Sequence, residues 1–392
     1  MSGGPTITGS VVPPTQPDPV CRIAAPGAVD GPVDVVLIGH TGQVGSAVRT
    51  RLDDVRDPTG RTLLRLREGI NRREHLRMTA GGVETRRRTS DALARLVERL
   101  VERLAASGRP TIVVDCTADP DLPEHYPEWL AAGIGVVTPN KHGFAGDPAL
   151  YGRIRSAADS GSAPLGYAAT VGAGLPVLST LRRLRASARA PVRIEAVLSG
   201  TLVQVFDRMA DGALLSEAVA AARDAGCTEP DPLDDLSGRD VARKLRILLR
   251  ENASVDGQAA REPTIEREPV VDDRWAERVR GRGDVIETLR DQDARWRTRV
   301  AAARADGRRW VYRAEAGPDG ARVGPVTVDA LDAFGRLDGS DNRLVLDGIG
   351  RDRARIVIEG PGAGIEVTAT SVLSDLADAA TKLIASPRWA IA

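Results

Sequence analysis

Short apolar runs and helical patterns alternate along the first third of the chain. Runs rich in Val, Ile and Leu occupy 33–39, 61–70, 110–118 and 135–141. Such short runs are typical of strands buried on both faces of a sheet. Helical patterns lie between them, from Ser46 onward, at 91–108 and at 127–133, while 71–90 is predicted to be a polar loop. This alternation predicts a parallel sheet with right-handed crossovers, in a Rossmann-type doubly wound α/β domain.

The pattern changes after about residue 165. Strand patterns, with hairpin-like spacing toward the C-terminal end, occupy 192–206, 308–316, 321–328, 342–349 and 353–360. Helical patterns lie between them at 216–226 and 240–253, and an amphipathic helix at 371–386 closes the sequence. The second part of the chain is therefore expected to be an α+β domain.

Composition and charge narrow the classes of partner and compartment. Lys+Arg and Asp+Glu both number 54, so the formal net charge is zero, and we expect neither nucleic acid nor an anionic membrane as a partner. No run approaches the ~20 apolar residues of a membrane span, and the N-terminus does not resemble a signal peptide. Three separated cysteines without a CxxC pair argue against a thiolate metal site. We expect a cytoplasmic protein.

A glycine-rich turn stands where a nucleotide site would be. The stretch IGHTGQVGS places Gly39, Gly42 and Gly45, with Val44, between a predicted strand and a predicted helix. Such a turn lets backbone N–H groups approach a pyrophosphate at the positive end of a helix. The spacing is Gly-x-x-Gly-x-x-Gly, and a tight turn that binds no ligand is the alternative interpretation.

The end of the second predicted strand bears on the choice of cofactor. An acidic residue there would bind a ribose 2′-hydroxyl, and arginine would accommodate a 2′-phosphate. Arg72 and Arg73 stand just past the strand and favour NADP, while Glu68 inside it leaves NAD open. The alternative is that both arginines are ordinary solvated residues of an arginine-rich chain.

Lysine is rare in this sequence and occurs only at Lys141, Lys244 and Lys382. A lysine ammonium can give up a proton, whereas a guanidinium stays charged at any working pH. Lys244 follows the acidic stretch GCTEPDPLDDLSGRDVAR, in which the prolines after Glu229 and Asp231 predict a turn and the end predicts a helix capped near Ser237. Asp240 and Lys244 share one helix face, which is compatible with an ordinary i, i+4 ion pair as well as with chemistry.

Several motifs together resemble the homoserine dehydrogenase family, both the catalytic part of the bifunctional aspartokinase–homoserine dehydrogenases and the fungal enzymes. They are VVDCTADPDLPEHYPEWLAAGIGVVTPNK, ATVGAGLPVLSTL, VLSGTL, GCTEPDPLDDLSGRDVARKLRIL, LDGSDNRLVL and GPGAGIEVTATSVLSDL. The resemblance extends from about residue 33 to the C-terminus, and TEPDPxDDLSGxDVARK is long enough to be highly specific.

The resemblance implies an NAD(P)-dependent oxidoreductase that interconverts L-aspartate 4-semialdehyde and L-homoserine. It implies catalytic roles for Lys244, Asp240 and Lys141. The implied substrate contacts are Glu229, Asp234, Asp235 and Thr201. The implied cofactor contacts are Gly39, Gly42, Val44, Gly45, Arg72, Arg73, Thr117, Lys141, Gly226 and Gly362. The backbone at Val171, Ala173 and Leu175 would correspond to a monovalent cation loop. Lys382 matches none of these roles and is expected at the surface.

The resemblance also suggests the organisation of the chain, with a homodimer as its assembly. We expect a disordered tail at 1–31, which is rich in Pro, Gly, Ser and Thr. A nucleotide-binding domain at 32–165 would be completed by 361–392. The catalytic and dimerisation domain would occupy 166–360.

Some positions depart from the family pattern. Ala168 stands where an acidic residue is usual, which bears on cation binding; Val203, Gln204 and Cys227 replace a polar–aromatic pair and a tyrosine; and His40 replaces a glycine of the turn. These changes leave two alternatives open, a paralogue that reduces a different amino-acid semialdehyde and a non-catalytic nucleotide-binding regulator. Both active-site lysines with Asp240 and Glu229 are retained, which argues against the regulator.

Overall fold

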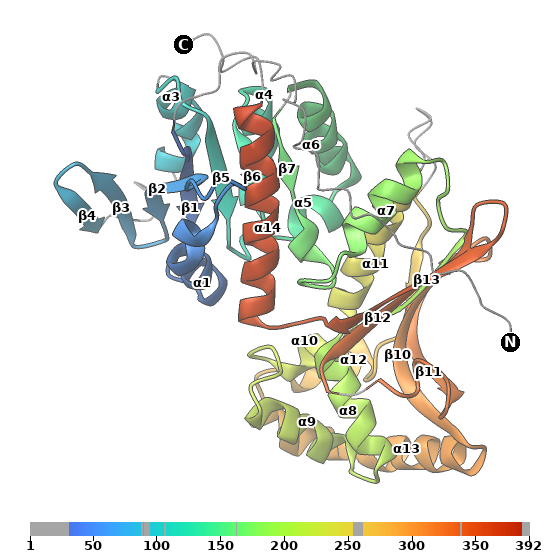
Figure 1. Ribbon diagram of the computed structural model, residues 1–392. Coiled ribbons are helices and arrows are strands. Elements are labelled where there is room, and N and C mark those ends of the chain that lie inside the picture. The colour runs from blue at the N-terminus through green and yellow to red at the C-terminus, as the bar shows by residue number, and fades with distance from the viewer. Residues whose placement is uncertain are drawn as a thin grey trace, which may run out of the picture.

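The computed structural model describes residues 31–385 except 88, 90–94, 106, 162, 254–261 and 338. The chain forms two sheets, a seven-stranded one and a six-stranded one, each covered by helices (Figure 1). The predicted tail, 1–31, lies outside the described residues apart from Gly31.

The seven-stranded sheet has the order β4-β3-β2-β1-β5-β6-β7. Its strands are β1 Val33–Ile38, β2 Leu64–Ile70, β3 Glu74–Thr79, β4 Gly82–Arg87, β5 Thr111–Asp115, β6 Gly135–Val137 and β7 Leu165–Gly166. The neighbours from β2 to β7 are parallel, and β3 and β4 add an antiparallel extension. The Rossmann-type sheet predicted from the strand–helix alternation is confirmed.

Helices cover both faces of this sheet. They are α1 Gln43–Arg51, α3 Leu100–Ala105, α4 Tyr126–Ala131, α5 His142–Ala145, α6 Pro148–Gly161 and α14 Ile365–Ile384. Helix α14 comes from the C-terminal end of the chain and lies beside α1 (Figure 1), where Ala369, Val372 and Leu376 are buried with Val35 and Leu37 of β1. The first sheet is thus completed by residues from both ends of the described chain.

The six-stranded sheet has the order β13-β12-β8-β10-β11-β9. Its strands are β8 Arg193–Val197, β9 Ile265–Arg267, β10 Arg308–Gly317, β11 Gly320–Asp329, β12 Asp341–Ile349 and β13 Ala354–Pro361. The helices of this part are α7 Val177–Ala186, α8 Gly200–Ala210, α9 Leu215–Asp224, α10 Pro232–Leu236, α11 Arg239–Asn252, α12 Asp273–Val279 and α13 Val285–Ala305. The α+β class predicted for the second domain is confirmed, whereas the exact domain boundaries stay predictions.

Three local predictions were wrong. The segment 71–90 is not simply a loop, because it contains the β3–β4 hairpin, whose strand β4 is exposed throughout and so has no apolar pattern to reveal it. The strand predicted over 192–206 ends at Val197, because Ser199 accepts a hydrogen bond from Leu202 N and starts helix α8. Helix α11, predicted with a cap near Ser237, begins at Arg239 after Gly238, and the residues before it form a separate short helix, α10, that was not predicted.

Within the described part of the chain, the helices are too short or too polar to cross a membrane.

Candidate active site

The glycine turn between β1 and α1 is too tight for larger residues. Gly39 has φ +82°, and a Cβ there would lie 2.8 Å from Cys116 O. A Cβ on Gly45 would lie 2.2 Å from Gly39 O, so the first turn of α1 approaches the strand end closely. Gly42 is the N-cap of α1, and Val44 packs on the core beneath the helix. The turn leaves the N-terminus of α1 facing the carboxyl edge of the sheet, the geometry that accepts a pyrophosphate.

Glu68, the acidic residue in β2 that could bind a ribose hydroxyl, is already paired within the protein. The Glu68 carboxylate is buried and accepts hydrogen bonds from both Arg103 Nη atoms, at 2.9 and 3.0 Å, and lies 3.0 Å from His75 Nε2. Desolvation would raise the pKa of Glu68, but its bonds to His75 and Arg103 outweigh that effect and lower the pKa to about 2. Glu68 is therefore not available to a ribose hydroxyl.

The two arginines at the same strand end are exposed. Arg72 lies 3.8 Å from Asp119, which follows β5, so its side chain extends along the carboxyl edge of the sheet. His40, the departure in the glycine turn, is buried against Gly69 and lies 3.3 Å from Glu74. Glu74 is thus a second carboxylate at this edge, and sequence reasoning did not identify it.

The loop that carries Lys141 is held by buried polar groups. Asp115, at the end of β5, accepts hydrogen bonds from Tyr126 and from Asn140 Nδ2, the latter at 2.9 Å. Asn140 also donates to Asp119 O, and its Oδ1 accepts from His142 N. This network fixes the turn after β6, so that Lys141 and Thr117 face the same space.

The acidic segment forms α10 and the start of α11. Ser237 accepts a hydrogen bond from Arg239 N at 3.2 Å and donates to Asp234 O. Gly238 has φ +67°, and a Cβ there would lie 1.7 Å from the Tyr312 hydroxyl of β10, so only glycine fits. The break aims the first turn of α11, with Asp240, toward the loop of Lys141.

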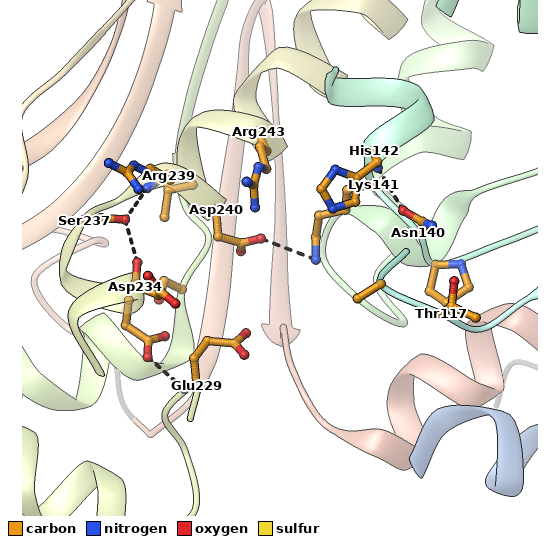
Figure 2. A pocket seen from close by; sticks show the side chains of 15 residues that line it. Thr117, Asn140, Lys141, His142, Glu229, Asp234, Ser237, Arg239, Asp240 and Arg243 are labelled. Atoms are coloured by element: carbon orange, nitrogen blue, oxygen red, sulfur yellow. Dashed lines mark hydrogen bonds and ion pairs between the residues drawn. The ribbon is translucent and has the colours of Figure 1, made fainter. Parts of the chain in front are cut away.

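A cavity of about 380 Å³ lies between this segment and the carboxyl edge of the first sheet (Figure 2). Its lining includes the acidic residues Glu229, Asp234, Asp235 and Asp240, the basic residues Lys141, Arg239 and Arg243, and Thr117, Asn140 and His142. The structure thus brings together predicted residues from both sheets' domains in one polar cavity.

Asp240 lies between the two lysines. Lys244 Nζ is 2.9 Å from Asp240 Oδ2 and donates to Leu198 O at 2.7 Å, while Lys141 Nζ is 3.4 Å from Asp240 Oδ1. Lys244 is not among the residues that line the cavity, and its side chain is only 12% exposed. Desolvation would raise the pKa of Asp240, but Lys244 and Lys141 together lower it below its ordinary value. The carboxylate therefore stays ionised and holds two ammonium groups.

The other acidic residues differ in their partners. Asp235 Oδ2 accepts a hydrogen bond from Glu229 N at 2.8 Å, and desolvation raises the pKa of Asp235 to about 6 despite that bond and the nearby Thr201 hydroxyl. Asp234 pairs with Arg280 at 2.9 Å. Thr201 donates to Cys227 O at 2.5 Å at the edge of the same segment.

Other predicted residues lie elsewhere and do not line the cavity. Gly226 follows the C-terminus of α9 with φ +69°. Gly362 follows β13 against the buried Asn342, with no room for a Cβ. The stretch from Val171 to Leu175 is a loop before α7, in which Gly172 and Ala173 have positive φ. Lys382 is exposed on α14, as predicted.

Comparison with known proteins decides the family. The family model for homoserine dehydrogenase matches residues 176–377, and the model for the homoserine dehydrogenase NAD-binding domain matches 41–167. The chain belongs to the homoserine dehydrogenase family. Members of this family are oxidoreductases, and the resemblance seen in the sequence motifs is confirmed.

Individual relatives agree with the family. A homoserine dehydrogenase of Emericella nidulans is 38% identical over 71% of this chain and 78% of its own length. A chloroplastic bifunctional aspartokinase/homoserine dehydrogenase of Zea mays is 37% identical over 68% of this chain, which spans only 29% of that protein.

Solved structures share the fold. A Candida auris protein of unknown function aligns with a TM-score of 0.75 at 27% identity, over 89% of this chain and 98% of that one. A hyperthermophilic archaeal homoserine dehydrogenase in complex with NADPH aligns with a TM-score of 0.66 at 21% identity, over 90% and 98% of the two chains.

Further residues of this homoserine dehydrogenase family member position the site, and the sequence motifs did not point to them. Arg250, buried on α11, donates to Phe144 O at 2.7 Å and to Gly146 O at 2.9 Å, the free carbonyls at the end of α5. Arg246 donates to Ala145 O in the same group. Because α5 begins directly after Lys141, these arginines join the helix of Lys244 to the loop of Lys141.

Proposed function

We propose that the protein interconverts L-aspartate 4-semialdehyde and L-homoserine with a nicotinamide cofactor. The observation that carries the proposal is Asp240 held between Lys141 and Lys244, beside an acidic cavity at the carboxyl edge of the nucleotide-type sheet. Ligands of such sheets bind at this edge. Membership of the homoserine dehydrogenase family supports the same reaction.

Lys244 is assigned as the acid/base. Reduction of the aldehyde adds hydride to carbon and a proton to oxygen, and the ammonium of Lys244 is the proposed source of that proton. In the direction of oxidation the neutral amine would accept the hydroxyl proton. Asp240 orients both lysines, because each of its carboxylate oxygens contacts one of them. Lys141 lines the cavity and would contact both substrate and cofactor.

The acidic wall would bind the substrate ammonium. Glu229 and Asp235 supply carboxylates, and Thr201 adds a hydroxyl close to Asp235. Asp234 is a weaker candidate, since Arg280 already pairs with it.

The proposed cofactor is NADP or NAD, with NADP favoured. The tight turn at Gly39, Gly42, Val44 and Gly45 fits a pyrophosphate, and a bound nicotinamide would supply or accept the hydride. The occupied Glu68 and the exposed Arg72 and Arg73 support NADP. Thr117 lines the cavity near the expected nicotinamide end. Contacts from Gly226 and Gly362 stay predictions.

A monovalent cation at the backbone of Val171, Ala173 and Leu175 is a further proposal. The positive φ values of Gly172 and Ala173 turn the loop sharply, which suits convergent carbonyl groups. Turnover compared in sodium, potassium and tetramethylammonium chloride at equal ionic strength tests it, since equal rates in all three would reject the site.

A homodimer is proposed for the assembly. The face of the six-stranded sheet away from its helices leaves Val357 of β13 at 52% exposure beside the Arg355–Asp347 pair, and a second copy would cover it. Light scattering on the purified protein measures the mass directly, and a monomer at micromolar concentration would reject this assembly.

The reaction itself is tested with purified protein, L-homoserine and each cofactor, by absorbance at the reduced nicotinamide band. Turnover with L-homoserine is expected. Turnover only with another amino alcohol would instead support a paralogue, for which the contact of Gln204 Nε2 with Cys227 Sγ at 3.3 Å is the motivating observation. Cofactor binding without turnover of any amino alcohol would support the non-catalytic regulator.

A further inference from the structure

Two charged side chains of opposite sign in the cavity have no protein partner within the described part of the chain. Most of its charges are paired: Asp240 with both lysines, Asp234 with Arg280, and Arg239 with Asp273 at 3.9 Å. Among the described residues, no hydrogen bond or ion pair is found for the carboxylate of Glu229 or the guanidinium of Arg243. These two groups are free to bind a ligand that carries both charges.

Arg243 occupies the helix that carries the proposed chemistry. It lies one residue before Lys244 and three after Asp240 on α11, so it follows Asp240 around the same side of the helix. Figure 2 shows its side chain beside Asp240 and His142, across the cavity from Glu229. Desolvation, Arg243 and Lys141 together lower the pKa of His142, which favours the neutral imidazole. The positive charge on this side therefore comes from Arg243 and from lysines that Asp240 already holds.

We propose that Arg243 binds the α-carboxylate of the amino-acid substrate while the Glu229 wall binds its ammonium. This inference rests on the proposed function, because it assigns the remaining charge of the same substrate. A guanidinium fits a carboxylate with two parallel hydrogen bonds, which a lysine ammonium cannot reproduce. Unpaired charges on opposite sides of one cavity match a zwitterion better than a simple alcohol or aldehyde.

The arrangement gives α11 two tasks. Lys244 serves the reacting oxygen, and Arg243 holds the far end of the same small molecule. A substrate held at both ends presents its reacting carbon in one orientation, so a larger fraction of the bound molecules has a reactive geometry. Arg243 is thus assigned to substrate specificity.

The test compares L-homoserine with 3-aminopropan-1-ol, which is the same amino alcohol without the carboxylate. Arg243→Met should raise the KM for L-homoserine about ten- to a hundredfold, the range of lost hydrogen bonds between charged groups. It should leave kcat/KM for 3-aminopropan-1-ol and the KM for the cofactor unchanged. Arg243→Lys should recover part of the L-homoserine affinity. Arg239→Met, which removes an equal charge from the same cavity, is the matched control and should not change the preference.

An equal loss with both substrates, or a change confined to the cofactor KM, would overturn the assignment. Calorimetric titration of L-homoserine separates this inference from the proposed reaction. If the wild-type protein turns over neither alcohol, weaker binding of L-homoserine to Arg243→Met than to wild type would still support the carboxylate contact. Equal binding by the two proteins would reject it. A thermal melt of each variant shows that it is folded.

Discussion

Two shielded carboxylates of this molecule, Glu68 and Asp235, have pKa values that are shifted in opposite directions. For both, desolvation is the largest influence on the pKa. Glu68 is surrounded by Arg103 and His75, and its pKa falls to about 2. Asp235 has one backbone N–H and a hydroxyl as partners, with Glu229 and Asp240 nearby, and its pKa rises to about 6. The partners, rather than burial alone, decide which carboxylate is a fixed part of the fold and which one is ready for a ligand.

The same contrast separates the two ends of the proposed binding region. At the end of β2, the carboxylate of Glu68 is already paired with Arg103 and lies 3.0 Å from His75 Nε2. In the cavity, the charged groups of Glu229 and Arg243 have no partner among the described residues, and Asp240 contacts both Lys141 and Lys244. Changing a charge that is already paired within the protein should therefore lower stability. Changing a charged residue at the cavity should instead alter catalysis or binding. Four substitution experiments examine this division.

Among changes at the proposed active site, Lys244→Arg should have the largest effect on turnover. Arginine keeps the positive charge but cannot release a proton, so turnover should fall by about 10²–10⁴-fold, the usual contribution of a general acid or base. Cofactor binding, measured by calorimetry, should stay near the wild-type value. Lys382→Arg, at the exposed lysine of α14, is the matched control. A Lys244→Arg variant that kept most of its rate would remove this lysine from the mechanism.

Among changes at the paired charges at the end of β2, Glu68→Gln should have the largest effect on stability. It leaves Arg103 and His75 around a neutral group, and breaking a buried pair in this way costs about 3–5 kcal/mol of unfolding free energy. Urea unfolding measures the loss, while the KM for L-homoserine should not change. Glu84→Gln, at the exposed pair with Arg86 on β4, should stay within about 0.5 kcal/mol of wild type.

The pH dependence of stability provides an independent check on the Glu68 cluster. Its pKa is lowered from 4.5 to about 2, so the pair contributes fully above pH 4.5 and loses its contribution as the pH falls toward 2. Glu68→Gln should remove that part of the acid dependence.

The Arg72→Gln, Arg73→Gln double variant tests whether the two exposed arginines next to the Glu68 cluster bind the cofactor. If they bind a 2′-phosphate, kcat/KM for NADP should fall about ten- to a hundredfold, and that for NAD should change little. Steady-state rates with both cofactors measure the ratio. Equal losses with both would mean that the arginines do not read the phosphate.

Asp235 should give the smallest effect, visible as a pH profile. Its carboxylate is protonated below about pH 6 and then attracts the substrate ammonium less. We expect kcat/KM for L-homoserine to decline below that pH, by up to about tenfold per unit. Asp235→Asn should flatten this limb. Asp375→Asn should keep it, because Asp375 has a pKa raised to about 6 but lies outside the cavity.

Local patterns were sufficient for the parts of the fold that repeat a simple rule. The buried strands, the glycine turn and the acidic segment before Lys244 could be recognised because each is contiguous in sequence. The β3–β4 hairpin could not, since its exposed strand β4 is specified by pairing rather than by burial. The break at Gly238 depends on Tyr312 of a distant strand.

In the site, too, features that are contiguous in sequence could be predicted, and those that depend on distant residues could not. The motifs indicated the acidic residues of the cavity and Lys141, but not Arg239 or Arg243, and not which of the charges were already paired. Arg280 beside Asp234, Arg103 around Glu68 and Arg250 on the α5 carbonyls come from distant parts of the chain. In a chain with so many arginines, their partners are visible only in three dimensions.

The return of α14 to the first sheet has a consequence for how the protein is made. The apolar face of β1 and α1 that α14 covers belongs to the earliest described residues, and α14 belongs to the latest of them. During translation this face stays uncovered until α14 has left the ribosome. Chaperone binding to nascent chains should therefore persist until the segment 365–384 emerges.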